Sequence, residues 1–367
     1  MPHGSGRVLV INPGSTSTKF GVYTKDGPEL VRTVHHTDED LAPFRERPVL
    51  DQLDYRAGQV KSELQKAGYG ASKFDAIVGR GGLLPPLASG TYLVDDVMLE
   101  QLRLARRGEH ASNLGAVLVH SFARQSGVNA YVVDPVSVDE WQDCARISGS
   151  ALVQRSCLSH ALNTKAVARR FAREQHREYQ EMRLIVVHMG SGISVSAHQN
   201  GQMIDNNTGE DGPFGIDRSG SLPVQELIKL CFSGLYTQKQ LDQLVFGTGG
   251  VSSYLGTKDW IEVERRIDAG EEKAAAVCEA MVYQIAKEAG AMAAVLRGKV
   301  DAVLLTGGMA HSKRIVTRLS EYLSWIAPIK VYPGEDELQS LADGAFRVLH
   351  GEDQPKTLQL EPTASAP

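Results

Sequence analysis

The chain has 367 residues, of which 42% are hydrophobic and 23% charged, and its formal net charge is −5. This length exceeds one ordinary hydrophobic core and predicts two domains, and the composition is that of a globular enzyme. The mild negative charge provides no bulk attraction to nucleic acid or anionic lipid, so we expect neither as a partner.

The chain shows no apolar run near the roughly 20 residues that span a bilayer, and it begins without an apolar signal core. Its four cysteines, Cys144, Cys157, Cys231 and Cys278, are scattered and form no C-x-x-C pair. Such spacing is typical of free thiols in a reducing compartment. We therefore expect a cytoplasmic protein without a membrane contact.

Two strands are expected at the start of the chain. Arg7–Ile11 is apolar and β-branched, as in a buried strand, and Lys19–Tyr23 resumes this character after the turn-forming residues 12–18. A further turn follows at residues 25–27. The pattern predicts an antiparallel hairpin with a glycine- and hydroxyl-rich loop.

The same pattern recurs in the second half of the chain. Strands are expected at Leu184–Val187 and Ile193–Ala197, with a turn at His188–Gly192 between them. Alignment of the two loops places pairs of residues at equivalent positions: Asn12 with His188, Gly14 with Gly190, and Ser15 with Ser191. This predicts an internal duplication, and the alternative is a pair of unrelated hairpins.

Helices and strands alternate between and after the hairpins. Strands are expected at residues 75–79, 130–134 and 302–308, and helices at 94–107 (with Asp95 as N-cap and Gly108 as the stop), 112–126 and 273–297. This alternation predicts an α/β fold with sheets covered on both faces.

The two domains are expected at residues 7–150 and 151–350, with the terminal helix able to pack back on the first. A loose tail is expected over 351–367, which is polar and rich in proline and alanine.

The loop of residues 12–19 has the clearest chemical signal. Its small and hydroxyl residues let a tetrahedral anion approach the backbone N–H groups, and Lys19 adds positive charge. It is not a Walker A loop, because no glycine precedes the lysine and a strand follows it. The alternative is an ordinary hairpin turn. Residues 188–194 repeat this chemistry, and two such loops facing each other across a cleft suit a polyphosphate nucleotide.

Further candidate residues lie at strand ends. Gly307 and Gly308 follow a strand where ligands of α/β folds bind, so they suit an adenine or ribose or form only a tight turn. Arg80 and Arg218 have glycine and serine neighbours and offer guanidinium groups to carboxylate or phosphate oxygens; a surface salt bridge is the alternative for each.

Histidine and acidic residues complete the set. His110 and His160 stand among small or polar residues and suit phosphoryl contact or a core position, and Asp134 ends a strand immediately before a proline. The acidic run Glu335–Glu337 suits a Mg²⁺ ligand or an acidic first turn of a helix.

Taken together, these motifs resemble the acetate and butyrate kinases of the acetokinase family, within the sugar kinase/Hsp70/actin superfamily. The resemblance spans residues 7–350, and the N-P-G-S-T-S-T-K form of the first loop is similar to that of the butyrate kinases. The other matching segments are Gly79–Leu83, Gly108–Gly115, Val133–Val136, Ala145–Gly149 and Gly307–Ser312.

The resemblance implies two duplicated actin/Hsp70-like ATPase domains around a central cleft. It implies transfer of the γ-phosphoryl group of ATP to the carboxylate of butyrate, with Mg²⁺ as cofactor, in at least a homodimer. Isobutyrate, acetate and propionate are alternative acids. A nucleotide-switched binding protein, like actin and Hsp70, is the alternative from another class.

The resemblance also implies roles for single residues. Ser159 stands where acetate kinases have a phenylalanine, which implies room for a longer acyl chain; the alternative is that it caps the following helix. Residues 250–259 depart from the acetate kinase pattern, so no nucleotide contact is assigned there. The implied roles are catalysis for Arg80, Asp134, His160 and Arg218; substrate binding for His110 and Ser159; nucleotide binding for Asn12, Gly14, Ser15, Ser17, Lys19, His188, Gly190, Ser191, Gly192, Gly307 and Gly308; and metal binding for Asn12, Asp336 and Glu337.

Overall fold

The computed structural model describes residues 6–70 and 73–360. The chain divides into two compact units: the described residues up to Asp139 with those from Asp336 onward form the first, and Glu140–Glu335 form the second. The sequence predicted the first domain boundary after residue 150, whereas the structure places it after Asp139. The terminal helix belongs to the first unit.

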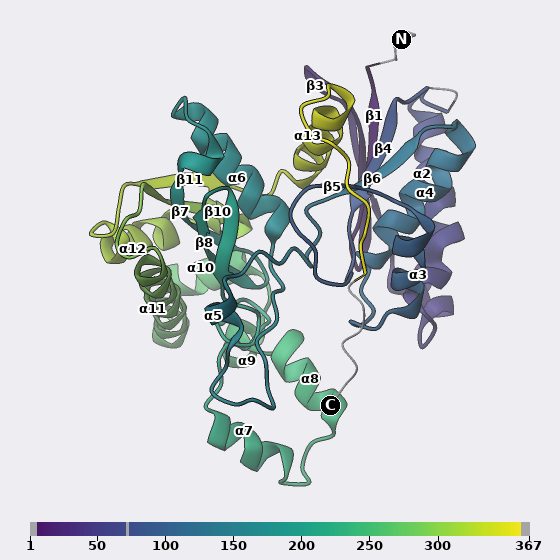
Figure 1. Cartoon of the computed structure of the whole chain (residues 1–367). Helices are drawn as coiled ribbons and strands as arrows, with labels where there is room; N and C mark the ends of the chain where they lie inside the picture. Colours follow the sequence, from purple (N-terminus) through teal and green to yellow (C-terminus); the bar gives the residue numbers. More distant parts are fainter. Residues whose placement is uncertain (1–5, 71–72, 361–367) are drawn as a thin grey trace. The chain divides into compact units, whose positions relative to one another are not determined.

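The first unit contains a six-stranded sheet with the order β3-β2-β1-β4-β6-β5. Helix α13 contacts β1 and β4, and α4 also contacts both strands; in Figure 1 the two helices lie on opposite sides of the sheet. The elements are β1 (Val8–Pro13), β2 (Ser17–Thr24), β3 (Gly27–His35), α1 (Asp38–Leu41), η1 (Ala42–Phe44), η2 (Val49–Gln52), α2 (Leu53–Lys66), β4 (Ala76–Arg80), β5 (Thr91–Leu93), α3 (Asp96–Leu104), α4 (Asn113–Ser126), β6 (Asn129–Val133) and α13 (Glu337–Leu349).

The second unit contains a five-stranded sheet with the order β11-β10-β7-β8-β9. Its elements are α5 (Asp143–Arg146), α6 (Ala161–Glu174), η3 (Tyr179–Glu181), β7 (Arg183–Met189), β8 (Ile193–Gln199), β9 (Gln202–Asn206), α7 (Val224–Cys231), α8 (Gln238–Phe246), α9 (Gly250–Leu255), α10 (Trp260–Asp268), α11 (Glu272–Val295), β10 (Ala302–Gly307), η4 (Gly308–His311), α12 (Lys313–Leu323) and β11 (Ile329–Pro333).

The two sheets repeat one topology. In the first, β1, β2 and β3 form an antiparallel meander, and β4 and β6 continue the sheet parallel to β1. In the second, β7, β8 and β9 form the meander, and β10 and β11 continue it parallel to β7. This shared order confirms the duplication that the sequence predicted and excludes two unrelated hairpins.

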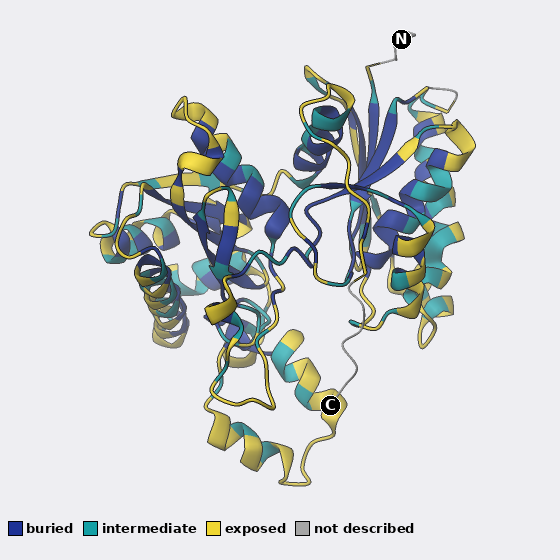
Figure 2. Ribbon diagram, viewed as in Figure 1, coloured by how far each residue is buried: buried dark blue, intermediate teal, exposed yellow. Residues whose placement is uncertain are grey.

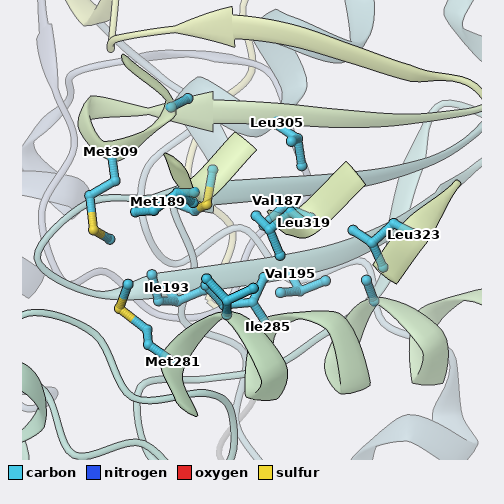
Figure 3. Packing of buried hydrophobic residues seen from close by; sticks show 14 of the residues in the cluster. Val187, Met189, Ile193, Val195, Met281, Ile285, Leu305, Met309, Leu319 and Leu323 are labelled. Atoms are coloured by element: carbon cyan, nitrogen blue, oxygen red, sulfur yellow. The ribbon is translucent and has the colours of Figure 1, made fainter. Parts of the chain in front are cut away.

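The central strands of the second unit bury both faces. Leu184 and Val186 pack with α6, whereas Val187 and Met189, on the opposite face of β7, belong to a second cluster. Figure 3 shows this second cluster, in which Ile285 of α11 lies beside Val195 and Val187. Because successive side chains of a strand point to opposite faces, a continuous apolar run is the sequence of a strand covered on both sides.

Burial is uneven among the helices of the second unit. Helices α7 and α8 contain no buried residue, and both are drawn mainly as exposed in Figure 2. Among the described residues, no helix is both long and apolar enough to cross a membrane.

Two predicted boundaries differ from the structure. Asp95 caps α3 as predicted, since its side chain accepts from the Met98 N–H at 2.9 Å, but the helix ends before Gly108, with Ala105 in the left-handed region. The predicted loose tail is partly ordered. Lys356 exchanges two 2.8 Å backbone hydrogen bonds with Thr91 and Leu93 on β5, an edge strand that would otherwise leave these groups unpaired. Residues 361–367 lie outside the described residues.

Gly307 ends β10 in close contact with β7. Its φ is +90°, and a Cβ there would lie 2.4 Å from the Met189 carbonyl oxygen. Gly308 has no atom within 4 Å of the corresponding position. The first glycine is therefore required by backbone packing, whereas the second leaves open space.

These two glycines form a matched pair for mutation. Gly307→Ala should lower the free energy of unfolding by about 2 kcal/mol or more, because a left-handed residue must then also displace backbone. Gly308→Ala should change it by less than about 0.5 kcal/mol. Urea denaturation of both variants measures the difference, and equal losses would contradict this account.

Candidate active site

The first predicted loop closes the β1–β2 hairpin. Asn12 pairs with Lys19 in the register, and the Gly14 N–H donates to the Ser17 carbonyl at 2.7 Å. The second loop closes similarly, with the Gly190 N–H donating to the Gly192 carbonyl at 3.1 Å. Both glycine amides are therefore used within their own turns, and an anion at either loop must be bound by other groups.

A buried arginine that the sequence analysis did not identify lies beneath the first loop. Arg56 of α2 is 0% exposed. Its Nη1 donates to the Gly14 carbonyl at 2.8 Å and the Ser17 carbonyl at 3.2 Å, and its Nη2 donates to the Ser15 carbonyl at 3.0 Å. An arginine in an amphipathic helix reads as a solvent-exposed residue, so no local sequence signal marks this position.

The Arg56 contacts extend into a buried histidine network. Nη1 also donates to Thr18 Oγ1 at 3.0 Å, and this hydroxyl lies 2.9 Å from His36 Nε2. The other ring nitrogen of His36 lies 3.1 Å from the Tyr55 hydroxyl. Burial, and then the nearby guanidinium of Arg56, lower the pKa of His36 from 6.5 to about 4. His36 is thus neutral at physiological pH.

Glu337 brings two predicted site residues together in the first unit. Its Oε2 accepts from Asn12 Nδ2 at 2.5 Å, and its Oε1 lies 3.0 Å from Arg80 Nη1. Glu337 is the first residue of α13, and Asp336 is the N-cap. One sequence segment after the second unit therefore supplies a carboxylate to the ends of β1 and β4.

This carboxylate fits the Mg²⁺ role that the family resemblance implies. Mg²⁺ is commonly bound by one or two carboxylates together with substrate phosphates and water. Among the described residues no group of three or more histidine, cysteine, aspartate or glutamate side chains forms a complete protein cage for a metal. Glu337, with Asn12 beside it, suits a site of the first kind.

Asp134 and His110 each accept hydrogen bonds within the first unit. Asp134 follows β6 with φ of +38°, is 1% exposed, and accepts from Ser89 Oγ at 2.5 Å and from the Gly90 N–H at 2.8 Å. His110 is exposed, and its Nδ1 accepts from the Ser112 N–H at 3.2 Å. In neutral His110 the ring proton is therefore on Nε2, which is a donor.

In the second unit, two predicted histidines stack on each other. The rings of His160 and His188 have centroids 4.0 Å apart and planes inclined by 15°. His160 Nδ1 lies 2.9 Å from Ser194 Oγ, and His188 Nδ1 lies 2.9 Å from Asn163 Oδ1. Since an amide oxygen only accepts, His188 Nδ1 carries a proton.

The remaining nitrogen of His188 faces Glu335. Nε2 is buried and makes no hydrogen bond within the described part of the chain, although Glu335 Oε1 lies 3.1 Å from it. A Cβ at Gly190 would lie 3.2 Å from this oxygen and 3.3 Å from Nε2. The absence of a side chain at Gly190 therefore keeps this space open.

Arg218 packs on the turn after His188. A Cβ at Gly192 would lie 2.8 Å from Arg218 Nη1, so the guanidinium lies directly on the glycine backbone. The Ser191 carbonyl accepts from the Ile216 N–H at 3.0 Å, which fixes the Arg218 loop to this turn. Ser191 is itself exposed.

Ser159 does not cap α6. The N-cap is His160, without a side-chain capping bond, and Ser159 Oγ instead lies 3.6 Å from Met203 Sδ. The capping alternative for Ser159 is therefore wrong. Ser159 is 6% exposed and lies beside the flexible thioether of Met203.

Residues 151–329 match the model of the acetokinase family. Similar solved structures include acetate kinase from Porphyromonas gingivalis (TM-score 0.74, 18% identity, covering 94% of this chain and 100% of that chain). A propionate kinase from Francisella tularensis has a TM-score of 0.72 at 16% identity, covering 92% of this chain and 98% of that one. Acetate kinase from Entamoeba histolytica has a TM-score of 0.73 at 15% identity, covering 93% and 99%.

These likenesses, together with the two sheets of shared topology, confirm the predicted α/β fold with a duplicated domain. The segment that matches the family model lies within the second unit and contains His160, His188 and Arg218.

The network around His36 predicts how stability depends on pH. The folded pKa lies below that of the unfolded chain, so the unfolded state binds more protons between pH 6.5 and pH 4. The contribution of His36 to the free energy of unfolding should be fully present above pH 6.5 and be lost as the pH drops to 4, by at most about 3 kcal/mol. His36→Gln should reduce this dependence in urea denaturation across that range.

The exposed His176 of the second unit supplies the control. His176→Gln removes an imidazole that is not among the groups acting on the pKa of His36, and it should keep the wild-type profile. If both variants retain the full pH dependence, His36 is not its source.

Proposed function

We propose that this chain is a short-chain fatty acid kinase that transfers the γ-phosphoryl group of ATP to a carboxylic acid, with butyrate as the preferred acid. The observation that carries the proposal is the cluster of His160, His188 and Arg218 around one glycine turn, within the residues that match the acetokinase family. We expect the enzyme to act in the cytoplasm as a homodimer or larger homo-oligomer, with no nucleic-acid or membrane partner.

The reaction needs little covalent chemistry from the protein. A carboxylate oxygen attacks the γ-phosphorus, the bond to the β–γ bridging oxygen breaks, and ADP leaves with the electron pair. Because a carboxylate is already a nucleophile, the protein has to supply position and charge stabilisation. ADP and acyl phosphate react back through the same transition state.

Arg218 and His160 are suited to the charge of the transferring group. The Arg218 guanidinium presents a planar set of donors, which matches phosphoryl oxygens. When His160 Nδ1 accepts a hydrogen bond from the Ser194 hydroxyl, the ring proton of neutral His160 is on Nε2, which can then act as a donor. We assign these donors to the equatorial oxygens of the phosphoryl group.

In the first unit we assign Arg80 to carboxylate or phosphoryl charge and the loop of residues 12–19, with Lys19, to the nucleotide phosphates. Glu337, with Asn12, would hold Mg²⁺, which when bound neutralises charge on the β- and γ-phosphates. In the structure Glu337 forms an ion pair with Arg80, which orients the guanidinium.

A hydroxamate assay with ATP, Mg²⁺ and straight and branched acids of two to six carbons tests the proposal. We expect acid-dependent hydroxamate, with the highest kcat/KM for butyrate. Formation of ADP without hydroxamate from any acid would contradict a carboxylate kinase and favour a nucleotide-switched protein. A maximum at acetate, propionate or isobutyrate would contradict only the choice of acid.

Arg218→Lys should lower kcat by about 100-fold or more, because lysine keeps the charge but loses the planar donor set. The KM for ATP should change far less. Arg170→Lys is the matched control, since Arg170 is exposed and pairs with Glu174 on the surface of α6. Normal turnover with weakened ATP binding in Arg218→Lys would show that Arg218 binds nucleotide rather than the transition state.

Acyl-chain length should depend on Ser159. Two additional methylenes contribute about 1.6 kcal/mol on burial, which corresponds to a preference of about 15-fold for butyrate over acetate. Ser159→Phe, which adds a large side chain at this buried position, should reduce kcat/KM for butyrate much more than for acetate. Ser159→Ala, which adds no volume, should retain the ratio. An unchanged ratio in Ser159→Phe would remove this residue from the acyl pocket.

A further inference from the structure

Arg56 is buried with its charge facing neutral acceptors. Apart from the loop carbonyls and Thr18, its hydrogen-bond partner in the described chain is Gln52, whose Oε1 accepts from Arg56 Nε at 2.9 Å. All of its hydrogen-bond acceptors in the described chain are thus neutral oxygens. Burial of a guanidinium without a carboxylate is costly, which suggests that its positive charge has a use.

The contacts of Arg56 also set the direction of the loop amides. The described peptide bonds are trans, so the N–H of each peptide points opposite to its C=O. The Gly14 and Ser15 carbonyls point toward Arg56, and the N–H groups of Ser15 and Thr16 must therefore point away from it. Ser15 and Thr16 are exposed, so these two N–H groups are directed to the outer side of the loop.

We propose that Arg56 is a positioning residue for nucleotide binding, which holds the amides of Ser15 and Thr16 outward as donors to a phosphate group. This inference rests on the proposed function. The guanidinium acts without touching the nucleotide: it fixes two peptide units, polarises them through their carbonyls, and leaves an uncompensated positive charge beneath the anion.

A merely structural role is the competing explanation. If Arg56 only joins α2 to the hairpin, its loss lowers stability and leaves the nucleotide affinity of the folded protein unchanged. If it positions the amides, its loss weakens the binding of ATP and ADP in particular. Nucleotide affinity, measured separately from stability, therefore distinguishes the two.

Arg56→Met in the full chain is the first test, with the dissociation constant for ADP measured by calorimetry together with the KM values of ATP and butyrate. We expect ADP and ATP to bind about 10- to 100-fold more weakly, as for the loss of charge-assisted hydrogen bonds. The KM for butyrate should change less than about 2-fold. Arg47→Met is the matched control, because Arg47 forms an exposed ion pair with Asp51 near the start of α2.

If Arg56→Met does not fold, nucleotide affinity is measured in Arg56→Lys instead. Lysine keeps the charge but cannot reach the separate acceptors of the planar group. We expect its nucleotide affinity to lie between those of the wild type and Arg56→Met. Wild-type nucleotide affinity in a folded Arg56 variant would overturn the proposal, even if the melting temperature falls.

The wild-type protein separates this inference from the function on which it rests. If wild type binds ADP and forms hydroxamate but the variants bind ADP equally well, only the role of Arg56 is wrong. If wild type binds no nucleotide, the proposed function fails, and the positioning role is overturned with it.

Discussion

Parallel pairing of the central strands is the constraint on which both candidate clusters depend. The strands β1, β4 and β6 run in one direction, as do β7, β10 and β11. In each sheet the carboxyl ends of these strands therefore lie on the same side. The interiors of β1, β4, β7 and β10 are buried and mainly apolar, whereas β11 contains no buried residue. Chemistry is therefore confined to the residues where the strands end, such as Arg80 on β4 and His188 on β7.

Because of the duplication, the two units have equivalent positions at the ends of their strands, but different residues occupy them. Asn12 and His188 stand at equivalent positions, and each meets a glutamate of the same tripeptide: Glu337 for Asn12 and Glu335 for His188. The division between the units falls between Glu335 and Asp336. One short acidic segment thus serves one equivalent position in each unit.

Two buried cationic side chains, Lys165 and Arg56, have different kinds of partner. Lys165 is fully buried and pairs at 2.5 Å with Glu140, which also accepts from the Met203 N–H at 3.0 Å. This pair is locally neutral and holds the start of the second unit on the β9 strand. Arg56 faces only neutral acceptors among the described residues, so its charge acts on whatever approaches the first loop.

The amino-acid sequence by itself determined the hairpins, the duplication and the Asp95 cap, because these depend on side-chain period and on residues within a few positions of one another. It also marked the loops and the arginines, through their glycine and serine neighbours. The Arg80–Glu337 and Asn12–Glu337 contacts join residues far apart in the chain, and no local pattern specifies such a pairing.

Tertiary structure decided the remainder. Ser159 has the sequence of a helix cap, but its hydroxyl turns to Met203. Gly307 has the sequence of a ligand-binding turn, but its immediate requirement is the backbone of Met189. Arg56 has the sequence of a surface residue, yet it is buried because the hairpin loop folds over it and supplies its carbonyls. In each case the partner comes from a distant element, and only packing of the whole unit determines which groups must be satisfied.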